Sequence, residues 1–212
     1  MRNEQFTRIV ETSPLFRLGN RVWLILLLGI LFSVTYWGSA ALAWREPFVL
    51  RPTFLDDRIS WQPDAIWFYV SQYALLFCAL WLPKDLDRAH AALAMMLVLG
   101  VGGIAFLLFP AIVPRSDVPA SGLTGLAWRL LYAIDTPANA IPSLHAALSV
   151  PAAVALWRTA PRWRVGGLLW LTVVLWSALA TKQHFVPDLT AGVCLGLVCH
   201  TLVALHSRVI AA

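Results

Sequence analysis

Two histidines and one aspartate carry the most distinctive chemistry in this sequence. His184 and Asp188 are four residues apart. On a helix they would share one face, where the carboxylate can hold one imidazole nitrogen and leave the other free to attack. His145 follows Pro142 and Ser143, a pair typical of a helix start. Because backbone N–H groups at a helix start bind anions, the pattern favours phosphoryl transfer.

Both histidines are predicted to face the same side of a membrane. The stretch from 145 to 184 is long enough for one helix that crosses a bilayer and a second that returns, at about 20 residues each. Arg115 and Lys182 fall on that same side. Positive groups fixed beside a helix start stabilise phosphate oxygens. Two histidines, one aspartate and two cations on one surface are therefore suited to phosphoryl transfer.

The composition indicates a membrane protein. Hydrophobic residues make up 59% of the chain and charged residues 13%, and the mean hydropathy is +0.72. A soluble domain has roughly 45–50% apolar residues. The net charge of +5 comes from basic residues scattered singly, which argues against nucleic acid as a partner and suits a membrane with anionic lipids. The three cysteines lie in apolar stretches, where we expect packing and no disulfide: Cys78, Cys194 and Cys199.

Six apolar segments approach the length of a membrane span: 22–44, 64–83, 89–109, 143–157, 165–180 and 187–205. Between the third and fourth segments, residues 123–133 include Trp128 and Tyr132, which favour the headgroup layer and predict an interfacial helix. We therefore predict an all-α integral membrane bundle of about six transmembrane helices. Residues 1–21 would form a cytoplasmic N-terminal segment, and residues 22–206 a single catalytic domain.

The distribution of charge predicts the orientation of this bundle. With the N-terminus in the cytoplasm, the cytoplasmic loops hold the larger share of Lys and Arg residues. Both termini are then cytoplasmic, and the two histidines lie on the extracytoplasmic side of the cell membrane. Arg51, Pro52, Asp56 and Asp57 would belong to the first outer loop, which we expect to be solvated.

The motifs resemble those of the type 2 phosphatidic acid phosphatase (PAP2) superfamily. The segment Pro142-Ser143-Leu144-His145 is similar to its second signature motif, and residues 177–188 are similar to its third. The residues of these two motifs are most similar to those of the inositolphosphotransferase-like branch. Phe109-Pro110 followed by Pro114-Arg115 resembles the segment that supplies a phosphate-binding arginine in that branch.

This resemblance implies a metal-independent lipid phosphatase or headgroup phosphotransferase that needs no cofactor. It implies that His184 is the nucleophile and forms a phosphohistidine, that Asp188 orients His184, and that His145 is the general acid. It also implies that Arg115, Lys182 and Ser143 bind the phosphate of the substrate. The sequence departs from the family pattern at two places. Leu108 and Ser116 stand where the first motif has lysine and proline, and Ala178 stands where many members have arginine. Lys182 is the residue that could supply the missing charge.

Two other classes of function stay open at this point. One is a membrane binding or transport protein without catalysis on the same scaffold. The other is a metal site built from His145, His184 and Asp188, in a membrane protein that could be an oxidoreductase. The positive charges nearby favour phosphate over a metal ion, because they repel a cation. The lipid substrate, the choice between hydrolysis and transfer, the acceptor and the oligomeric state are not determined by the sequence.

Overall fold

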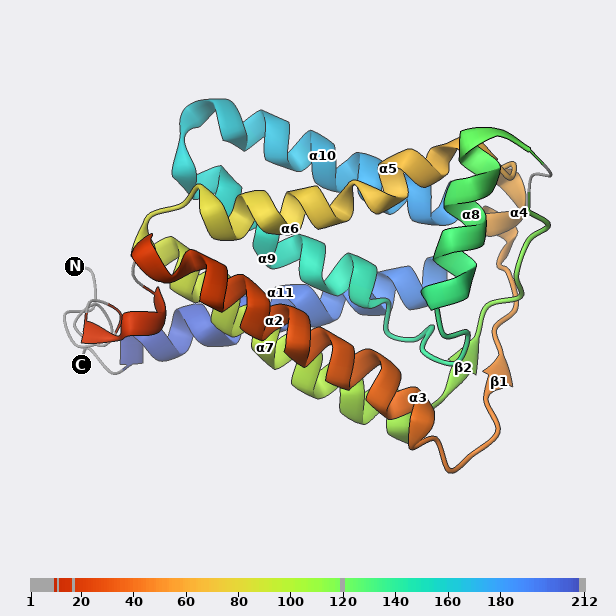
Figure 1. Ribbon diagram of the computed structural model, residues 1–212, viewed down its shortest axis with the longest axis horizontal. Coiled ribbons are helices and arrows are strands. Elements are labelled where there is room, and N and C mark those ends of the chain that lie inside the picture. Colours follow the sequence, from red (N-terminus) through yellow and green to blue (C-terminus); the bar gives the residue numbers. More distant parts are fainter. Residues whose placement is uncertain (1–9, 11, 17, 119–120, 210–212) are drawn as a thin grey trace.

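In the computed structural model, helices run side by side along one axis, and one helix lies across an end of the bundle (Figure 1). The structure describes residues 10, 12–16, 18–118 and 121–209. Most of the N-terminal segment predicted for residues 1–21 lies outside the described residues. The ends of the described chain lie together at one end of the bundle. At the other end lie α4 (Phe54–Arg58), α8 (Gly122–Ile134), β1 (Phe48–Val49) and β2 (Ala111–Ile112).

Each of the six predicted spans is helical. The first span comprises α2 (Arg21–Ser33), a π-helical turn η3 (Val34–Gly38) and α3 (Ser39–Ala41). The second comprises η4 (Pro63–Ala65), α5 (Ile66–Val70) and α6 (Gln72–Trp81). The remaining four spans are single helices: α7 (Asp85–Leu108), α9 (Leu144–Thr159), α10 (Pro161–Ala180) and α11 (Val186–Val209). Two short 3-10 turns, η1 (Pro14–Phe16) and η2 (Leu18–Asn20), precede α2. The chain is thus an all-α protein of the membrane class.

Fewer than six of these helices are individually long and apolar enough to cross a membrane. Four qualify within the described part of the chain: Arg21–Ala41, Asp85–Leu108, Pro161–Ala180 and Val186–Ser207. The second predicted span is divided at Ser71, whose hydroxyl donates to the carbonyl of Phe68, a local bond that bends helices. The fourth, α9, has only 16 residues and contains Pro151.

The short helix α9 occupies the centre of the bundle. It packs against α6, α7, α10 and α11. Eleven of its 16 residues are buried, and five of these are alanine. Small side chains allow neighbouring helices to approach closely, as they do between helices in membranes. The predicted catalytic residue His145 is therefore carried by the most enclosed helix.

Two glycines of α11 set its distance from α9. A Cβ at Gly192 would lie 2.3 Å from the carbonyl oxygen of Ser143, and a Cβ at Gly196 would lie 2.5 Å from that of Ala147. No side chain fits at either position without moving the backbone. The spacing of four residues places both glycines on one face of the helix.

The end of the bundle opposite the termini is closed by several connecting segments. The strands β1 (Phe48–Val49) and β2 (Ala111–Ile112) pair in parallel, and Ala111 also exchanges backbone hydrogen bonds with Ala138 and Ala140. The predicted interfacial helix is α8 (Gly122–Ile134), which lies across this end (Figure 1). The connection predicted to be the first outer loop contains a short helix, α4 (Phe54–Arg58).

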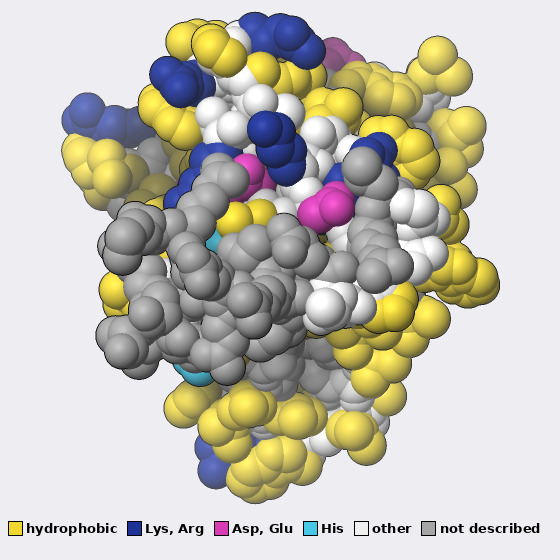
Figure 2. Space-filling view, turned by 90° about the vertical axis from the view of Figure 1, so that its left-hand side faces the viewer, with side chains coloured by type: hydrophobic (Ala, Val, Ile, Leu, Met, Phe, Trp, Pro, Cys, Tyr) yellow, Lys and Arg dark blue, Asp and Glu magenta, His cyan; other side chains and the backbone are white. Residues whose placement is uncertain are grey.

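The end of the bundle that holds the termini shows Lys and Arg side chains among hydrophobic ones (Figure 2). One basic residue there is structural, since Arg88 is fully buried and its guanidinium donates to the carbonyls of Phe16, Leu80 and Pro83. It also forms a salt bridge of 2.6 Å with Asp85. The turn between α6 and α7 is thereby joined to the segment before α2.

Candidate active site

His184 and Asp188 form a buried pair at the start of α11. Nδ1 of His184 donates to one carboxylate oxygen of Asp188, and the other oxygen accepts the backbone N–H of Phe185 at 2.8 Å. Asp188 is fully buried, whereas His184 is 8% exposed. The carboxylate therefore fixes the tautomer that carries a proton on Nδ1, and Nε2 is left with a free lone pair.

The turn before this pair is shaped by hydrogen bonds to backbone carbonyls. The amides of Gln183 and His184 both donate to the carbonyl of Ala178 at 3.2 Å. Lys182 adopts a positive φ of 53°, a conformation that few residues other than glycine adopt. Its ammonium donates to the carbonyls of Asp56 and Ile59, each at 2.6 Å, and these two bonds hold it.

His145 lies at the first turn of α9 and faces the second histidine. The ring centroids of His145 and His184 are 6.4 Å apart. His145 stacks on the ring of Tyr69, with centroids 3.9 Å apart, and its Nε2 lies 2.9 Å from the backbone carbonyl of Tyr69. Because a carbonyl oxygen only accepts, Nε2 carries a proton, and Nδ1 is the nitrogen available for proton exchange.

Ser143 is the N-cap of α9. Its hydroxyl accepts the backbone N–H of Ala146 at 3.3 Å. Its own backbone N–H donates to the carbonyl of Asp188 at 3.0 Å. The side chain is fully buried and is not among the described residues that line the cavity. The structure thus gives Ser143 a clear capping role and a position behind the two histidines.

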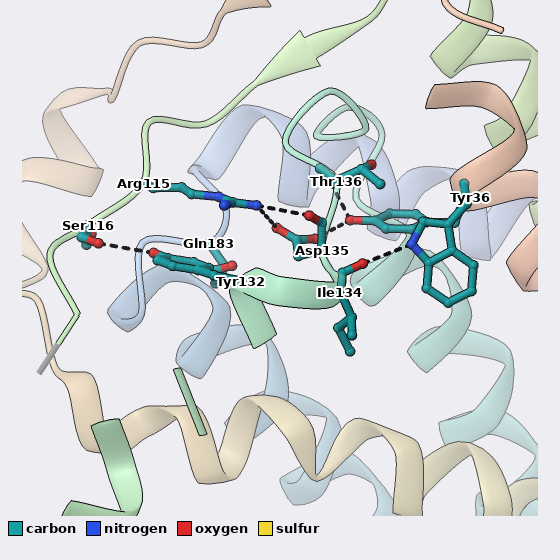
Figure 3. Close-up of polar contacts among 9 residues, drawn as sticks. Tyr36, Arg115, Ser116, Tyr132, Ile134, Asp135, Thr136 and Gln183 are labelled. Atoms are coloured by element: carbon teal, nitrogen blue, oxygen red, sulfur yellow. Dashed lines mark hydrogen bonds and ion pairs between the residues drawn. The ribbon is translucent and has the colours of Figure 1, made fainter. Parts of the chain in front are cut away.

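Arg115 lies on the chain between β2 and α8, beside an acidic residue (Figure 3). Its Nη2 donates to the backbone carbonyl of Asp135 at 2.9 Å and lies 3.6 Å from a carboxylate oxygen of the same residue. The guanidinium also covers the ring of Tyr132, 4.5 Å from its centroid. The hydroxyl of Tyr132 accepts a hydrogen bond from the side chain of Gln183 at 3.3 Å. Tyr132 therefore connects Arg115 to the turn that carries His184.

Tyr132 keeps its proton in this position. Burial raises the pKa of its hydroxyl, and this effect outweighs the nearby charge of Arg115, which lowers the pKa. The hydroxyl can therefore donate to the carbonyl of Ser116 at 3.3 Å while accepting from Gln183.

A cavity of about 590 Å³ joins these residues. His145, His184, Lys182 and Arg115 line it together with Asp135. The cavity continues between α2, α6, α7 and α9, where its lining is apolar: Ile25, Leu28, Phe32, Leu76, Phe77, Leu80, Met95, Leu99, Leu144 and Leu148. One cavity thus offers a polar end with two imidazoles and two cations, and an apolar wall for an acyl or alkyl chain.

Asp56 is a site residue that sequence reasoning placed wrongly, in a solvated loop. It is 1% exposed. One carboxylate oxygen accepts the backbone N–H of Val186 at 2.9 Å, next to the pair of His184 and Asp188, and the other accepts both the N–H and the hydroxyl of Thr53 at 2.7 Å. The capping box of Thr53 and Asp56 was the signal in the sequence that could have identified a short helix here.

The geometry above defines a membrane protein with a histidine–histidine–aspartate site at one end of a helical bundle. Residues 65–202 match the family model of the PAP2 superfamily. The match covers more than half of the chain, and the chain belongs to this superfamily, whose members are generally phosphatases. No curated protein and no solved structure matches the chain significantly. The inositolphosphotransferase-like branch stays a prediction from the motifs.

Proposed function

We propose that the chain is a lipid phosphatase or phosphotransferase that acts through a phosphohistidine on His184. The observation that carries this proposal is the buried pair of His184 and Asp188 facing His145 inside a cavity with an apolar wall. Membership of the PAP2 superfamily supports the same class of reaction.

In the first step, Nε2 of His184 attacks the phosphorus of a lipid phosphate. The bond between phosphorus and the lipid oxygen breaks, and that oxygen takes a proton from Nδ1 of a protonated His145, so a lipid alcohol leaves. Asp188 stabilises the charge that develops on the ring of His184. The separation of 6.4 Å between the ring centroids leaves space for one phosphoryl group.

In the second step, Nδ1 of His145 accepts a proton from water or from an acceptor alcohol. The resulting oxygen nucleophile attacks phosphorus, the bond between phosphorus and Nε2 breaks, and phosphate or a phosphorylated acceptor leaves. This step returns the proton to His145 and frees His184. Hydrolysis requires water in the cavity, whereas transfer requires a second polar ligand there.

Arg115 and Lys182 supply positive charge at the polar end of the cavity. The Lys182 ammonium has three protons, and the carbonyls of Asp56 and Ile59 use two of them. The third can bind a phosphate oxygen. Arg115 contributes a planar guanidinium that can bind two oxygens at once. Ser143 contributes through the cap that orients the first turn of α9.

We also propose that the bundle crosses the cell membrane six times, with residues 22–206 forming one catalytic domain. The unit from η4 to α6 and the central helix α9 would cross with the four longer helices. Exposed basic residues at the end that holds the termini support a cytoplasmic location of that end: Lys84, Arg158, Arg162 and Arg164. The catalytic cavity would then open on the extracytoplasmic side.

A panel of lipid phosphates tests the reaction. We expect the detergent-purified chain to release inorganic phosphate from at least one of them in the presence of chelator, and to transfer a labelled phosphoryl group to an added lipid alcohol if it is a transferase. Release that requires an added metal ion would contradict the proposal. Absence of both release and transfer across phosphomonoesters and phosphodiesters would favour a protein that binds without catalysis.

A further inference from the structure

Arg115, the cation predicted to bind phosphate, contacts a carboxylate from its own chain. Its Nη2 lies 3.6 Å from a carboxylate oxygen of Asp135 and 2.9 Å from the backbone carbonyl of that residue. Both residues line the cavity that contains His145 and His184. Asp135 directly follows α8 and is thus a candidate competitor for Arg115 inside the proposed substrate site.

Asp135 is held in place from the first span. The hydroxyl of Tyr36 donates to its second carboxylate oxygen, and the indole N–H of Trp37 donates to the carbonyl of Ile134 at 2.9 Å (Figure 3). Asn139 also donates from its side chain to the carbonyl of Tyr36. The carboxylate is therefore positioned by neighbours on η3, and Arg115 is the partner that can exchange.

The contact between the two charges is suited to exchange. At 3.6 Å it is longer than a hydrogen bond, and the side chains of Arg115 and Asp135 are 37% and 23% exposed. Ion pairs this accessible to water are weak. A phosphate group offers several oxygens and can bind a guanidinium through two parallel hydrogen bonds, which a carboxylate at this distance does not form.

We propose that Asp135 is a specificity-determining residue that occupies Arg115 until the phosphate of a substrate displaces it. This inference rests on the proposed function. Free inorganic phosphate has only its charge with which to displace the carboxylate, whereas a lipid phosphate also gains from the apolar wall of the cavity. Asp135 thereby weakens the binding of free phosphate and favours phosphate that is attached to a lipid.

Calorimetric titration of inorganic phosphate into the detergent-purified full chain tests the proposal without turnover. Asp135→Asn should lower the Kd for phosphate by about fivefold or more, because it removes the competing charge and keeps the size of the side chain. Asp117→Asn is the matched control, since it removes the same charge from an exposed position two residues after Arg115 and should leave the Kd within about twofold.

A double-mutant cycle tests whether Asp135 changes phosphate affinity through Arg115. In an Arg115→Ala background, Asp135→Asn should change the Kd by less than about twofold, because the two residues act as one pair. An unchanged or higher Kd in Asp135→Asn would overturn the proposal, as would a full effect without Arg115, or no phosphate binding in either the wild-type chain or Asp135→Asn.

Lipid phosphate turnover is measured separately on the same preparations. Tighter phosphate binding in Asp135→Asn, combined with no turnover in any variant, would reject the catalytic function and keep the role of Asp135. Turnover in the wild-type chain with an unchanged Kd in Asp135→Asn would reject the role of Asp135 and keep the catalytic function.

Discussion

The backbone amide of Ser143 donates a hydrogen bond of 3.0 Å to the carbonyl of Asp188. This bond joins the N-cap of α9 to the first turn of α11. His145 lies in the first turn of α9, and His184 lies two residues before α11 begins. The relative position of His145 and His184 is therefore set by how closely the two helices pack, and any change that separates them should affect catalysis before it affects the fold.

Gly192→Ala should separate the two helices. The added Cβ would lie 2.3 Å from the carbonyl oxygen of Ser143, so we expect a loss of stability of about 1–3 kcal/mol from overpacking and a larger loss of kcat than of substrate affinity. Gly100→Ala is the control, because nothing lies within 4 Å of its added Cβ and alanine favours helices. Thermal unfolding and steady-state kinetics would check both; equal effects of the two substitutions would contradict the packing argument.

His184→Ala should abolish formation of a phosphorylated protein. Without Nε2 there is no nucleophile for phosphorus. Asp188→Asn should lower kcat by about 10²–10⁴-fold, because the amide no longer stabilises the charged ring. Brief incubation with a radiolabelled lipid phosphate, followed by acid and alkali treatment, would detect a label that is acid-labile and alkali-stable. Such a label in His184→Ala would place the nucleophile elsewhere.

His145→Gln should show an effect that depends on the leaving group. A lipid alkoxide needs a proton as it leaves, and we expect a loss of about 10²–10⁴-fold in kcat/KM for alkyl phosphates. The loss should be much smaller for p-nitrophenyl phosphate, whose phenolate leaves without a proton. Comparison of kcat/KM for the two substrates is the measurement. An equal loss for both would show that His145 is not the general acid.

The helices and the contact between His184 and Asp188 could be predicted because local patterns determine them. Long apolar runs define spans, and the predicted interfacial segment 123–133 corresponds to α8 (Gly122–Ile134). The pairing of His184 with Asp188 was predicted from a spacing of one helical turn. The pair forms, but His184 lies in the turn before α11 and not on the helix itself. The superfamily was predicted from motifs within residues 65–202 and is confirmed. Four helices qualify as spans among the described residues, against six predicted. The second predicted span is divided at Ser71, where a hydroxyl bonds to a backbone carbonyl, and the fourth has only 16 helical residues; hydropathy registers neither feature.

The contacts of the cations could not be predicted, because they join segments far apart in the sequence. Lys182 donates to carbonyls in the first outer loop, and Arg115 lies beside Asp135 at the end of α8. The capping box of Thr53 and Asp56 is local and could have been predicted, but the contact of Asp56 with Val186 joins segments far apart in the sequence. Only the folded chain brings Asp56 to the amide of Val186.

Asp56→Asn should test whether the first outer loop positions the catalytic turn. The buried carboxylate accepts from Val186 and Thr53, and an asparagine would direct N–H groups at one of these donors, which should destabilise the fold by about 1–3 kcal/mol. Asp57→Asn makes the same change at an exposed neighbour and should be neutral. Because the carbonyl of Asp56 also holds Lys182, we expect Asp56→Asn to lower kcat at temperatures where the protein is still folded. Circular dichroism and phosphate release on matched samples would check this. Full activity in folded Asp56→Asn would show that the loop with Asp56 does not position the turn that carries His184.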